Sequence, residues 1–312
     1  MQLLKLKQEQ IQLTSKYYSC MESPNLNLDY DKLNILGCNI EYANVQGYRQ
    51  TNEDEISITA DGENVLIAIF DGHGGDWVSN HCSKFYHKVL YNTEEYKNKE
   101  YEKALIETNK ILDRWLYNQP ISNIKQFIKT DITNYLFKHR INTAKFHKQE
   151  FHHSNECGST CLSVLITKDE IYCSNIGDSR AVLFENENSI VMNVEHTLTN
   201  EIERLEESGY PIINNRLGGS INVVRGFGDF KFKNPYDEPI NQGVLNIPDI
   251  TVYKREPNQK IILGCDGFWD GIKDEYPNGL SHDFIDSQNL KMITKMAALK
   301  SYDNVSAILV EL

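Results

Sequence analysis

The segment VLIAIFDGHGG, residues 65–75, joins an apolar run to a glycine-rich turn. The run Val65–Phe70 has the length and composition of a buried strand, and Asp71 and His73 follow directly at its end. The glycines around His73 allow the backbone to lie close to a ligand, because they carry no side chain. A strand end of this kind predicts a site for a metal ion or a phosphate, with a purely structural turn as the alternative.

The same pattern recurs elsewhere in the chain. The apolar run Lys260–Cys265 is followed by Asp266, Glu53 and Asp54 occupy a turn between expected strands, and Asp303 precedes the last one. If these carboxylates converge, they form an all-oxygen site, which suits Mg²⁺ or Mn²⁺ better than zinc. Such a set can hold two ions that share one bridging carboxylate and clamp a phosphoryl group. A solvated turn residue is the alternative for each of them taken alone.

Composition excludes several classes of function. The 312-residue chain has a formal net charge of −12, which argues against nucleic acid or an anionic membrane as its main partner. Its seven cysteines contain no Cys-x-x-Cys pair, so neither a zinc ribbon nor a disulfide framework is indicated. No run is long enough to cross a membrane. We expect a cytoplasmic protein, with a nuclear location as an alternative, that acts as a monomer.

Periodicity suggests the arrangement of elements. Residues 1–36 are polar and predict a loose arm or an edge addition, followed by one domain over residues 37–312. Alternating or apolar runs predict strands, the first three of which we expect to form an antiparallel meander. The expected strands are 38–45, 56–59, 65–70, 160–167, 170–175, 180–184, 190–193, 222–224, 250–253, 260–265 and 305–310.

Helical periodicity appears in blocks between these strands. Apolar residues recur at helical spacing over residues 78–89, 101–115 and 121–135, and a further helix is expected at 290–299. A short helix is expected between a cap at Asn200 and a stop at Gly209. Strands and helices come in clusters instead of alternating one for one, which predicts an α+β layered fold.

Seven short motifs follow one another along the chain: RQTNED (49–54), FDGHGG (70–75), GST (158–160), NIGDSRAVL (175–183), RGFGD (225–229), CDGFWD (265–270) and DN (303–304). Taken together and in this order, they resemble the signature blocks of the metal-dependent protein phosphatases of the protein phosphatase 2C type, the PPM family. The resemblance extends over residues 37–310.

The resemblance implies a four-layer α-β-β-α sandwich with two central antiparallel sheets. It implies hydrolysis of phosphoserine and phosphothreonine in phosphorylated protein substrates, with two Mg²⁺ or Mn²⁺ ions and a weaker third. In this family pattern Asp71 bridges the two ions, and Asp54 orients metal-bound waters. The metal-binding residues that it implies are Glu53, Asp54, Asp71, Gly72 through its carbonyl, Asp266, Asp303 and Asp270.

The resemblance also implies the catalytic residues. Arg49 is expected to hold the substrate phosphate through its guanidinium fork, and the alternative is a surface arginine paired with Glu53. A metal-bridging hydroxide would attack phosphorus in line, and His73 would protonate the leaving alkoxide as general acid. The alternative for His73 is a hydrogen bond to a nearby carboxylate.

Some positions depart from the family pattern or look structural. Glu195 stands where the family usually carries an aspartate that, with the equivalent of Asp270, can hold the third metal. Glutamate is one methylene longer, so a third ion is left open here. Asp178 and Ser179 have the composition of a tight turn, and we do not assign them to the site.

Three other functions compete with this interpretation. A cysteine-based phosphatase requires His-Cys-x5-Arg, but Lys88 stands at the arginine position after Cys82. A calcineurin-like phosphoesterase shares the Asp-x-His start but needs a later Gly-Asn-His-Glu, which the chain lacks. A catalytically inactive phosphatase-like binding module is the remaining alternative, and it would be expected to lose the metal carboxylates that this chain keeps.

Overall fold

The computed structural model describes residues 20–118, 157–186, 188–233, 241–274, 280 and 289–312. The strands are β1 (Asn25–Ile35), β2 (Cys38–Gly47), β3 (Glu55–Ala60), β4 (Val65–Phe70), β5 (Gly72–His73), β6 (Gly158–Ser159), β7 (Cys161–Ile166), β8 (Glu170–Ile176), β9 (Arg180–Glu185), β10 (Asn188–Val191), β11 (Ile212–Ile213), β12 (Arg216–Leu217), β13 (Phe227–Gly228), β14 (Asp249–Lys254), β15 (Lys260–Gly264) and β16 (Val305–Glu311). The helices are α2 (Trp77–Asn92), α3 (Glu94–Lys97), α4 (Tyr101–Tyr117), α7 (Ile202–Ser208), α8 (Asp266–Ile272), α10 (Leu290–Lys300) and the 3₁₀ helix η3 (Phe230–Phe232).

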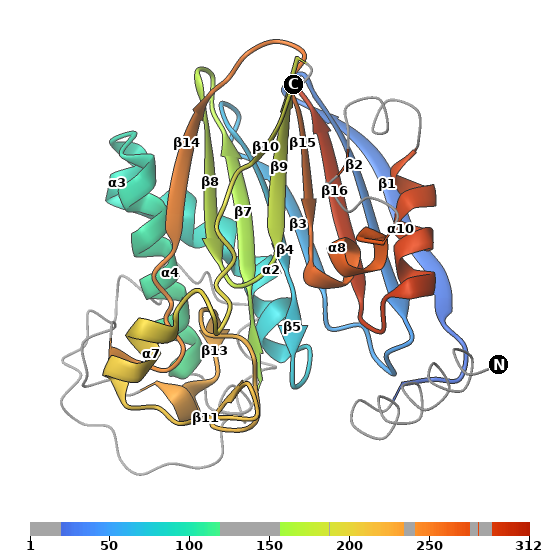
Figure 1. Cartoon of the computed structure of the whole chain (residues 1–312). Coiled ribbons are helices and arrows are strands. Elements are labelled where there is room, and N and C mark those ends of the chain that lie inside the picture. The colour runs from blue at the N-terminus through green and yellow to red at the C-terminus, as the bar shows by residue number, and fades with distance from the viewer. Residues whose placement is uncertain (1–19, 119–156, 187, 234–240, 275–279, 281–288) are drawn as a thin grey trace.

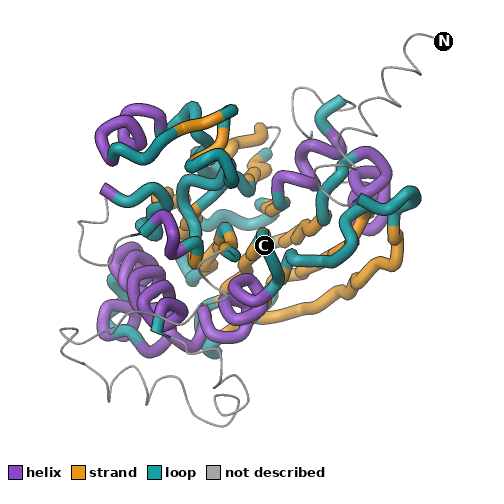
Figure 2. Tube along the Cα trace, turned by 90° about the horizontal axis from the view of Figure 1, so that it is seen from below, coloured by secondary structure: helices purple, strands orange, loops and turns teal. Residues whose placement is uncertain are grey.

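Two antiparallel sheets form the centre of the molecule (Figure 1). One has six strands in the order β1-β2-β16-β15-β9-β10, and the other has five in the order β14-β8-β7-β4-β3. Helices α2 and α4 pack on the five-stranded sheet, and α8 and α10 pack on the six-stranded sheet. Seen from the end of the strands, helices lie on the two outer sides with the strands between them (Figure 2). The expected α-β-β-α sandwich is confirmed.

Strand β4 shows how the sequence produces these layers. Its odd-numbered residues, such as Ile67, join the core shared with the six-stranded sheet. Its even-numbered residues, such as Phe70, join a second core with α2 and α4. A strand covered on both faces needs an unbroken apolar run, because successive side chains point to opposite faces. This is why residues 65–70 carry no polar side chain.

The polar N-terminal segment contributes an edge strand. Within residues 1–36, β1 pairs antiparallel with β2, for example Leu33 opposite Ile40. Leu33 packs against the core, while charged residues such as Lys32 face outward. For residues 25–35 the segment is therefore an addition to the sheet edge; residues 1–19 lie outside the described residues.

The expected meander of the first three strands is wrong. Strand β2 pairs with β1 and β16 in the six-stranded sheet, whereas β3 pairs with β4 in the five-stranded sheet. The intervening segment 48–54 crosses from one sheet to the other at the end of the sandwich. This crossing carries Arg49, Glu53 and Asp54 to the place where the acidic strand ends meet.

Two smaller expectations are also wrong. Residues 222–224 form no strand, because Val224 is buried in a small third core by a loop instead of a sheet. The N-cap residue of α7 is Glu201, whose side chain makes no capping hydrogen bond, while the Asn200 side-chain amide donates to the Glu195 carbonyl. The stop at Gly209 is confirmed by its left-handed φ of 73°. The helix expected at 121–135 lies outside the described residues.

The remaining described helices agree with the expected periodicity. Helices α2, α4 and α10 cover the expected 78–89, 101–115 and 290–299. None of the helices within the described ranges is both long enough and apolar enough to span a bilayer.

Candidate active site at one end of the sandwich

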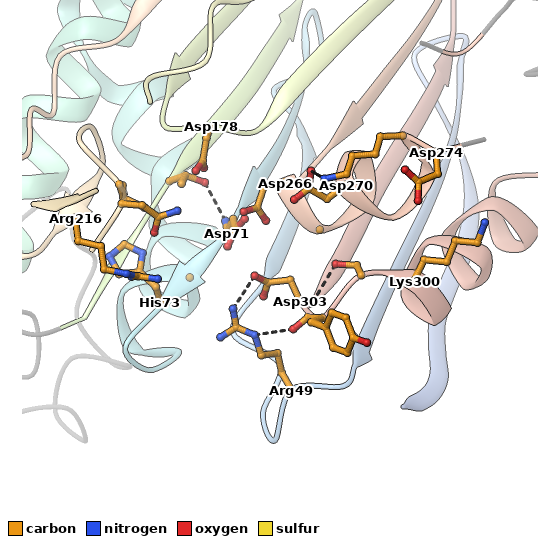
Figure 3. A pocket seen from close by; sticks show the side chains of 18 residues that line it. Arg49, Asp71, His73, Asp178, Arg216, Asp266, Asp270, Asp274, Lys300 and Asp303 are labelled. Carbon is orange, nitrogen blue, oxygen red and sulfur yellow. Dashed lines mark hydrogen bonds and ion pairs between the residues drawn. The ribbon is translucent and has the colours of Figure 1, made fainter. Parts of the chain in front are cut away.

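Four aspartates meet at one end of the two sheets because of strand direction. Strands β4 and β8 run parallel to each other on either side of β7, so Asp71 and Asp178 follow them at the same end. Strands β15 and β16 are antiparallel, so Asp266 after β15 lies near Asp303 before β16. All four line a cavity of about 370 Å³ (Figure 3).

The carboxylates form two groups that share Asp71. In one group, oxygens of Asp71, Asp178 and Asp266 all lie within 4.8 Å of one another. In the other, Asp54 and Asp71 approach the Cys265 sulfur within the same distance. Within one group, the structure thus brings together residues that are up to 211 positions apart in the chain, from Asp54 to Cys265. It also gives Asp71 the central position expected of a bridging carboxylate.

Burial and the negative charges of neighbouring carboxylates both disfavour ionisation of these carboxyl groups. Burial, with the neighbouring Asp54 and Asp266, raises the pKa of Asp71 well above its usual range. Burial likewise raises the pKa of Asp54 to about 7 and that of Asp178 to about 6. Burial, followed by the charges of Asp178 and Asp303, raises the pKa of Asp266. A cluster of this kind is stabilised when cations neutralise it.

The donor set fits hard divalent cations. The Oδ1 atom of Asp266 is buried and has no hydrogen-bond partner among the described residues. Buried polar atoms are normally satisfied, so this one is free to accept a metal. Burial, with the charges of Asp54 and Asp71, raises the pKa of Cys265 well above its usual range. Because the neutral thiol is a poor ligand, the carboxylate oxygens are the better donors to a metal in this group.

Arg49 projects into the cavity from the segment that connects the two sheets (Figure 3). Its Nη2 donates to Oδ2 of Asp303 at 2.6 Å, and its Nε donates to the Tyr302 carbonyl at 3.1 Å. The guanidinium therefore pairs with Asp303 and not, as the alternative expected, with Glu53. This contact places a cation beside the acidic cluster while leaving about a third of the side chain exposed, with relative exposures of 30% for Arg49 and 32% for Asp303.

The backbones of Glu53 and Gly72 are in close contact beside the cavity. The Glu53 backbone amide donates to the Asn304 side chain at 2.9 Å, and Asn304 also binds the Gln46 and Thr51 carbonyls. A Cβ on Gly72 would stand 2.3 Å from the Glu53 carbonyl oxygen, so only glycine fits there. Gly72 lines the cavity. Glu53 is not among the lining residues, and its Oε1 accepts from Thr51 at 3.1 Å.

Asp54 lies beneath the cluster. It is 4% exposed, and its Oδ2 accepts a hydrogen bond from the Ser306 hydroxyl at 2.8 Å. Ligand atoms of Asp71 and Cys265 lie within 4.8 Å of its carboxylate.

His73 bonds a carboxylate that the sequence analysis did not single out. Its Nε2 donates to Oδ2 of Asp229 at 2.6 Å, and Asp229 is fully buried. Burial lowers the pKa of His73, but the charge and hydrogen bond of Asp229, with Asp178 and Glu53, outweigh it and raise the pKa overall. The histidine is thus both hydrogen-bonded, as the alternative expected, and kept protonated at higher pH.

A buried ion pair holds the segment that carries Asp229. Lys233 donates to both oxygens of Asp113 on α4 at 2.9 Å, and neither side chain is more than 5% exposed. Asp113 also accepts from the Gly228 amide at 3.0 Å and from Asn246 at 2.8 Å. Because Gly228 precedes Asp229, this network sets where Asp229 meets His73.

The structure does not place Glu195 in the cavity with Asp270, the pair of positions at which a third metal was left open. The Glu195 carboxylate accepts from Arg180 Nε at 2.5 Å and does not line the cavity. Asp270 lines the cavity and is paired with Lys273 at 3.0 Å. Asp178, assigned only to a turn, stands in the cluster instead. It follows an apolar strand, as Asp71 does, and that repeated pattern was the signal available in the sequence.

Gly177 positions Asp178, and we expect its substitution to be costly. In Gly177→Ala a Cβ would lie 2.5 Å from the Thr160 side chain at a φ of 125°, so we expect a loss of at least about 2 kcal/mol of folding free energy. The matched control is Gly209→Ala, where φ is 73° and nothing lies within 4 Å; there we expect about 1 kcal/mol. Urea denaturation measures both, and equal losses would contradict the role of the Thr160 contact.

Comparison with known proteins agrees with this geometry. The family model described as "Protein phosphatase 2C" matches residues 39–305. "Probable protein phosphatase 2C 2" of Paramecium tetraurelia is 29% identical over 235 residues, covering 73% of this chain and 72% of the relative. "Probable protein phosphatase 2C 6" of the same organism is 28% identical over 307 residues, covering 90% and 96%.

The fold is shared with solved structures. A crystal structure of serine-threonine phosphatase 2C from Toxoplasma gondii superposes with a TM-score of 0.63 at 17% identity, covering 91% of this chain and 98% of that chain. Together with the match of the family model over most of the chain, this shows that the protein belongs to the protein phosphatase 2C family.

Proposed function

We propose that this protein phosphatase hydrolyses phosphoserine and phosphothreonine in proteins, and that it requires Mg²⁺ or Mn²⁺. The observation that carries the proposal is the convergence of Asp71, Asp178, Asp266 and Asp303 on one cavity. Four half-buried carboxyl groups in one place are unfavourable without cations, so the arrangement is best explained by metal binding. The name of the Toxoplasma gondii structure supports the serine/threonine class.

The acidic residues of the cavity and their neighbours would hold the metal ions. Asp71, with Asp266 and Asp303 on one side and Glu53 and the Gly72 carbonyl on the other, would hold two ions. Asp54 orients this set from below, and Asp178 with Asp266 and Asp270 offers a place for a weaker third ion. When bound, such ions supply an activated hydroxide and positive charge for the phosphoryl oxygens.

Arg49 and His73 act on the substrate itself. The Arg49 guanidinium matches two phosphate oxygens, and it can leave Asp303 for the substrate because both side chains are partly exposed. His73 donates its proton to the serine or threonine oxygen that leaves, because an alkoxide is a poor leaving group. Its Nε2 bond to Asp229 orients the ring and favours the protonated form, so that the other nitrogen, Nδ1, would carry the proton that is transferred.

The test of this function is hydrolysis of p-nitrophenyl phosphate and of a phosphothreonine peptide in Mn²⁺, in Mg²⁺ and in EDTA. We expect turnover of both substrates that depends on either metal and stops in EDTA. Folded protein that binds a phosphopeptide without turning it over in Mn²⁺ would instead favour the inactive binding module.

A substitution of His73 should affect the two substrates unequally. We expect His73→Asn to lower kcat for the phosphothreonine peptide by about a hundredfold, the usual contribution of a general acid. The p-nitrophenolate group leaves without a proton, so its kcat should fall far less. Steady-state kinetics on both substrates check this, and an equal loss on both would contradict the general-acid role.

The pH profile should move when Asp229 is neutralised. For the peptide, kcat/KM falls as pH rises through the pKa of His73, because the acid loses its proton. In Asp229→Asn the carboxylate that raises this pKa is gone, so burial dominates and the basic limb should move to lower pH by at least about one unit. Profiles at saturating Mn²⁺ for both proteins measure the shift. If the basic limb of the kcat/KM profile lies at the same pH in Asp229→Asn as in the wild type, a group other than His73 causes it.

A further inference from the structure

A second cavity, of about 380 Å³, lies beside the catalytic one. Its walls come from α7, from the segment before α7 and from the β11–β12 hairpin, which lie below the sandwich in Figure 1. Asp178 and Asn222 line both cavities, so the two spaces share a wall. The hairpin itself divides them, because Arg216 faces the catalytic cavity while Ile212 and Asn215 face the second one.

Three aliphatic side chains line this second cavity, Leu198, Ile202 and Ile212, together with five polar residues. Leu198 and Ile212 are half-buried and pack against the small third core, and Ile202 on α7 is 39% exposed. The polar lining residues are Thr197, Thr199, Asn215, Asn222 and Asp178, and Asp178 is the one ionisable side chain among the described residues that line the cavity. Exposed aliphatic surface in a hollow is covered favourably by another apolar group, at about 25 cal/mol per Å² removed from water.

The wall that carries Ile202 is held firmly. Glu201, directly before Ile202, accepts from Arg204 and from Arg225, and Glu201 and Arg204 are each only 9% exposed. Arg225 also donates to Asp249 on β14 at 2.9 Å, which ties α7 to the five-stranded sheet. Arg204 further donates to the Val224 carbonyl at 3.1 Å. A wall fixed by several buried charged contacts forms a pocket before any ligand arrives.

We propose that the second cavity binds an apolar side chain of the substrate, of the size of leucine or isoleucine, close in sequence to the phosphorylated residue. This rests on the proposed phosphatase function, which places the phosphorylated side chain in the catalytic cavity. An extended peptide advances about 3.3 Å per residue, so a chain with its phosphate in one cavity presents a neighbouring side chain to the adjoining one.

The charges around the cavity favour an uncharged occupant. The protein carries a net charge of −12, and Asp178 contributes to the shared wall, so an acidic side chain is disfavoured. A lysine or arginine would have to lose water among Leu198, Ile202 and Ile212. An aliphatic side chain pays neither cost and covers all three.

The experiment is a leucine scan of a phosphothreonine peptide. A single leucine is moved through about four positions on each side of the phosphothreonine in an otherwise serine- and glycine-containing peptide, and kcat/KM is divided by that for p-nitrophenyl phosphate. We expect one position to raise the ratio about tenfold, the usual effect of one well-filled hydrophobic contact.

Two substitutions of exposed isoleucines test the location. Ile202→Asp should abolish the leucine preference and favour lysine at the same position. Ile213→Asp is the matched control, because Ile213 is 51% exposed on the same hairpin but does not line the cavity; it should keep the preference.

The outcomes separate this inference from the proposed function. A flat scan with normal turnover of p-nitrophenyl phosphate would overturn the inference and leave the phosphatase function standing. A preference that survives Ile202→Asp, or that Ile213→Asp removes equally, would also overturn it. No metal-dependent turnover of either substrate would overturn the proposed function, and this inference with it.

Discussion

Asp71→Asn is expected to reduce Mn²⁺-dependent hydrolysis of p-nitrophenyl phosphate by at least about a thousandfold. Asp71 belongs to both carboxylate groups, so its loss disturbs both metal positions at once. Metal ions contribute several kcal/mol to transition-state stabilisation, and about 4 kcal/mol corresponds to a factor of a thousand. Steady-state rates over a range of Mn²⁺ concentrations measure the loss. Turnover at the wild-type rate would refute the assignment of Asp71.

The same variant should be more stable than the wild type without metal. Because burial and neighbouring carboxylates raise the pKa of Asp71, the folded wild type binds this proton more tightly than the unfolded chain does. The free energy of unfolding of the wild type therefore falls as pH rises from about 4, the pKa in the unfolded chain, through the raised pKa of the folded state. The Asp71→Asn variant has no carboxyl group at this position and does not lose this stability. Thermal denaturation in EDTA at pH 5 and pH 8 should show a gain for the variant that is larger at pH 8.

Asp61→Asn provides a control of opposite sign. Asp61 lies in the β3–β4 turn, where burial raises its pKa but the combined hydrogen bonds from Tyr96, Asn64 and Glu63 lower it overall. A lowered pKa stabilises the fold above the pKa of the unfolded chain and loses that effect as pH falls, so Asp61→Asn should reduce stability at pH 8. Metal-dependent turnover should be unchanged. A gain in stability here would show that any removed charge stabilises the protein.

Asp113→Ala is expected to cost about 3 to 5 kcal/mol of folding free energy, because it leaves Lys233 buried without its partner. The Gly228 amide also loses its acceptor. The double variant Asp113→Asn/Lys233→Met keeps an acceptor for Gly228 and removes the buried charge. We expect it to recover all but about 1 to 2 kcal/mol. Urea denaturation of the wild type and both variants measures these differences.

A partly exposed ion pair is the control for Asp113. Lys260 and Glu311 lie 2.8 Å apart on β15 and β16, and the Glu311 side chain is 45% exposed. Glu311→Ala should cost no more than about 1 kcal/mol, because solvent screens exposed pairs. If Asp113→Ala cost no more than this control, the network would not hold α4 to the segment that carries Asp229.

Much of the fold was predictable because local patterns reflect burial on one or two faces. The unbroken apolar runs became central strands such as β4 and β15, and helical spacing marked α2, α4 and α10. The pattern did not assign strands to sheets. Strand β2 pairs with β16, more than 250 residues later, and no local signal announces that partner. The meander expected from sequence order was therefore wrong.

The site residues likewise include some that the sequence identified and some that it did not. Asp71, Asp266 and Asp303 were identified because each adjoins an apolar strand and matches a family motif. Asp178 was missed because Gly177-Asp178-Ser179 also has the composition of an ordinary turn. Asp229 was missed because its partner His73 is 156 residues away, and the contact depends on three short strands, β5, β6 and β13, that are two residues long.

The sequence alone determined the layers of this protein, its acidic strand ends and its family, since each of these is written in residues that are neighbours in the chain. Only the tertiary structure decided which carboxylates share a cavity, that Arg49 pairs with Asp303, and that a second cavity with three aliphatic side chains adjoins the site. These features depend on distances between segments far apart in sequence. Such distances are set by how sheets and helices pack together, and no local pattern of residues encodes them.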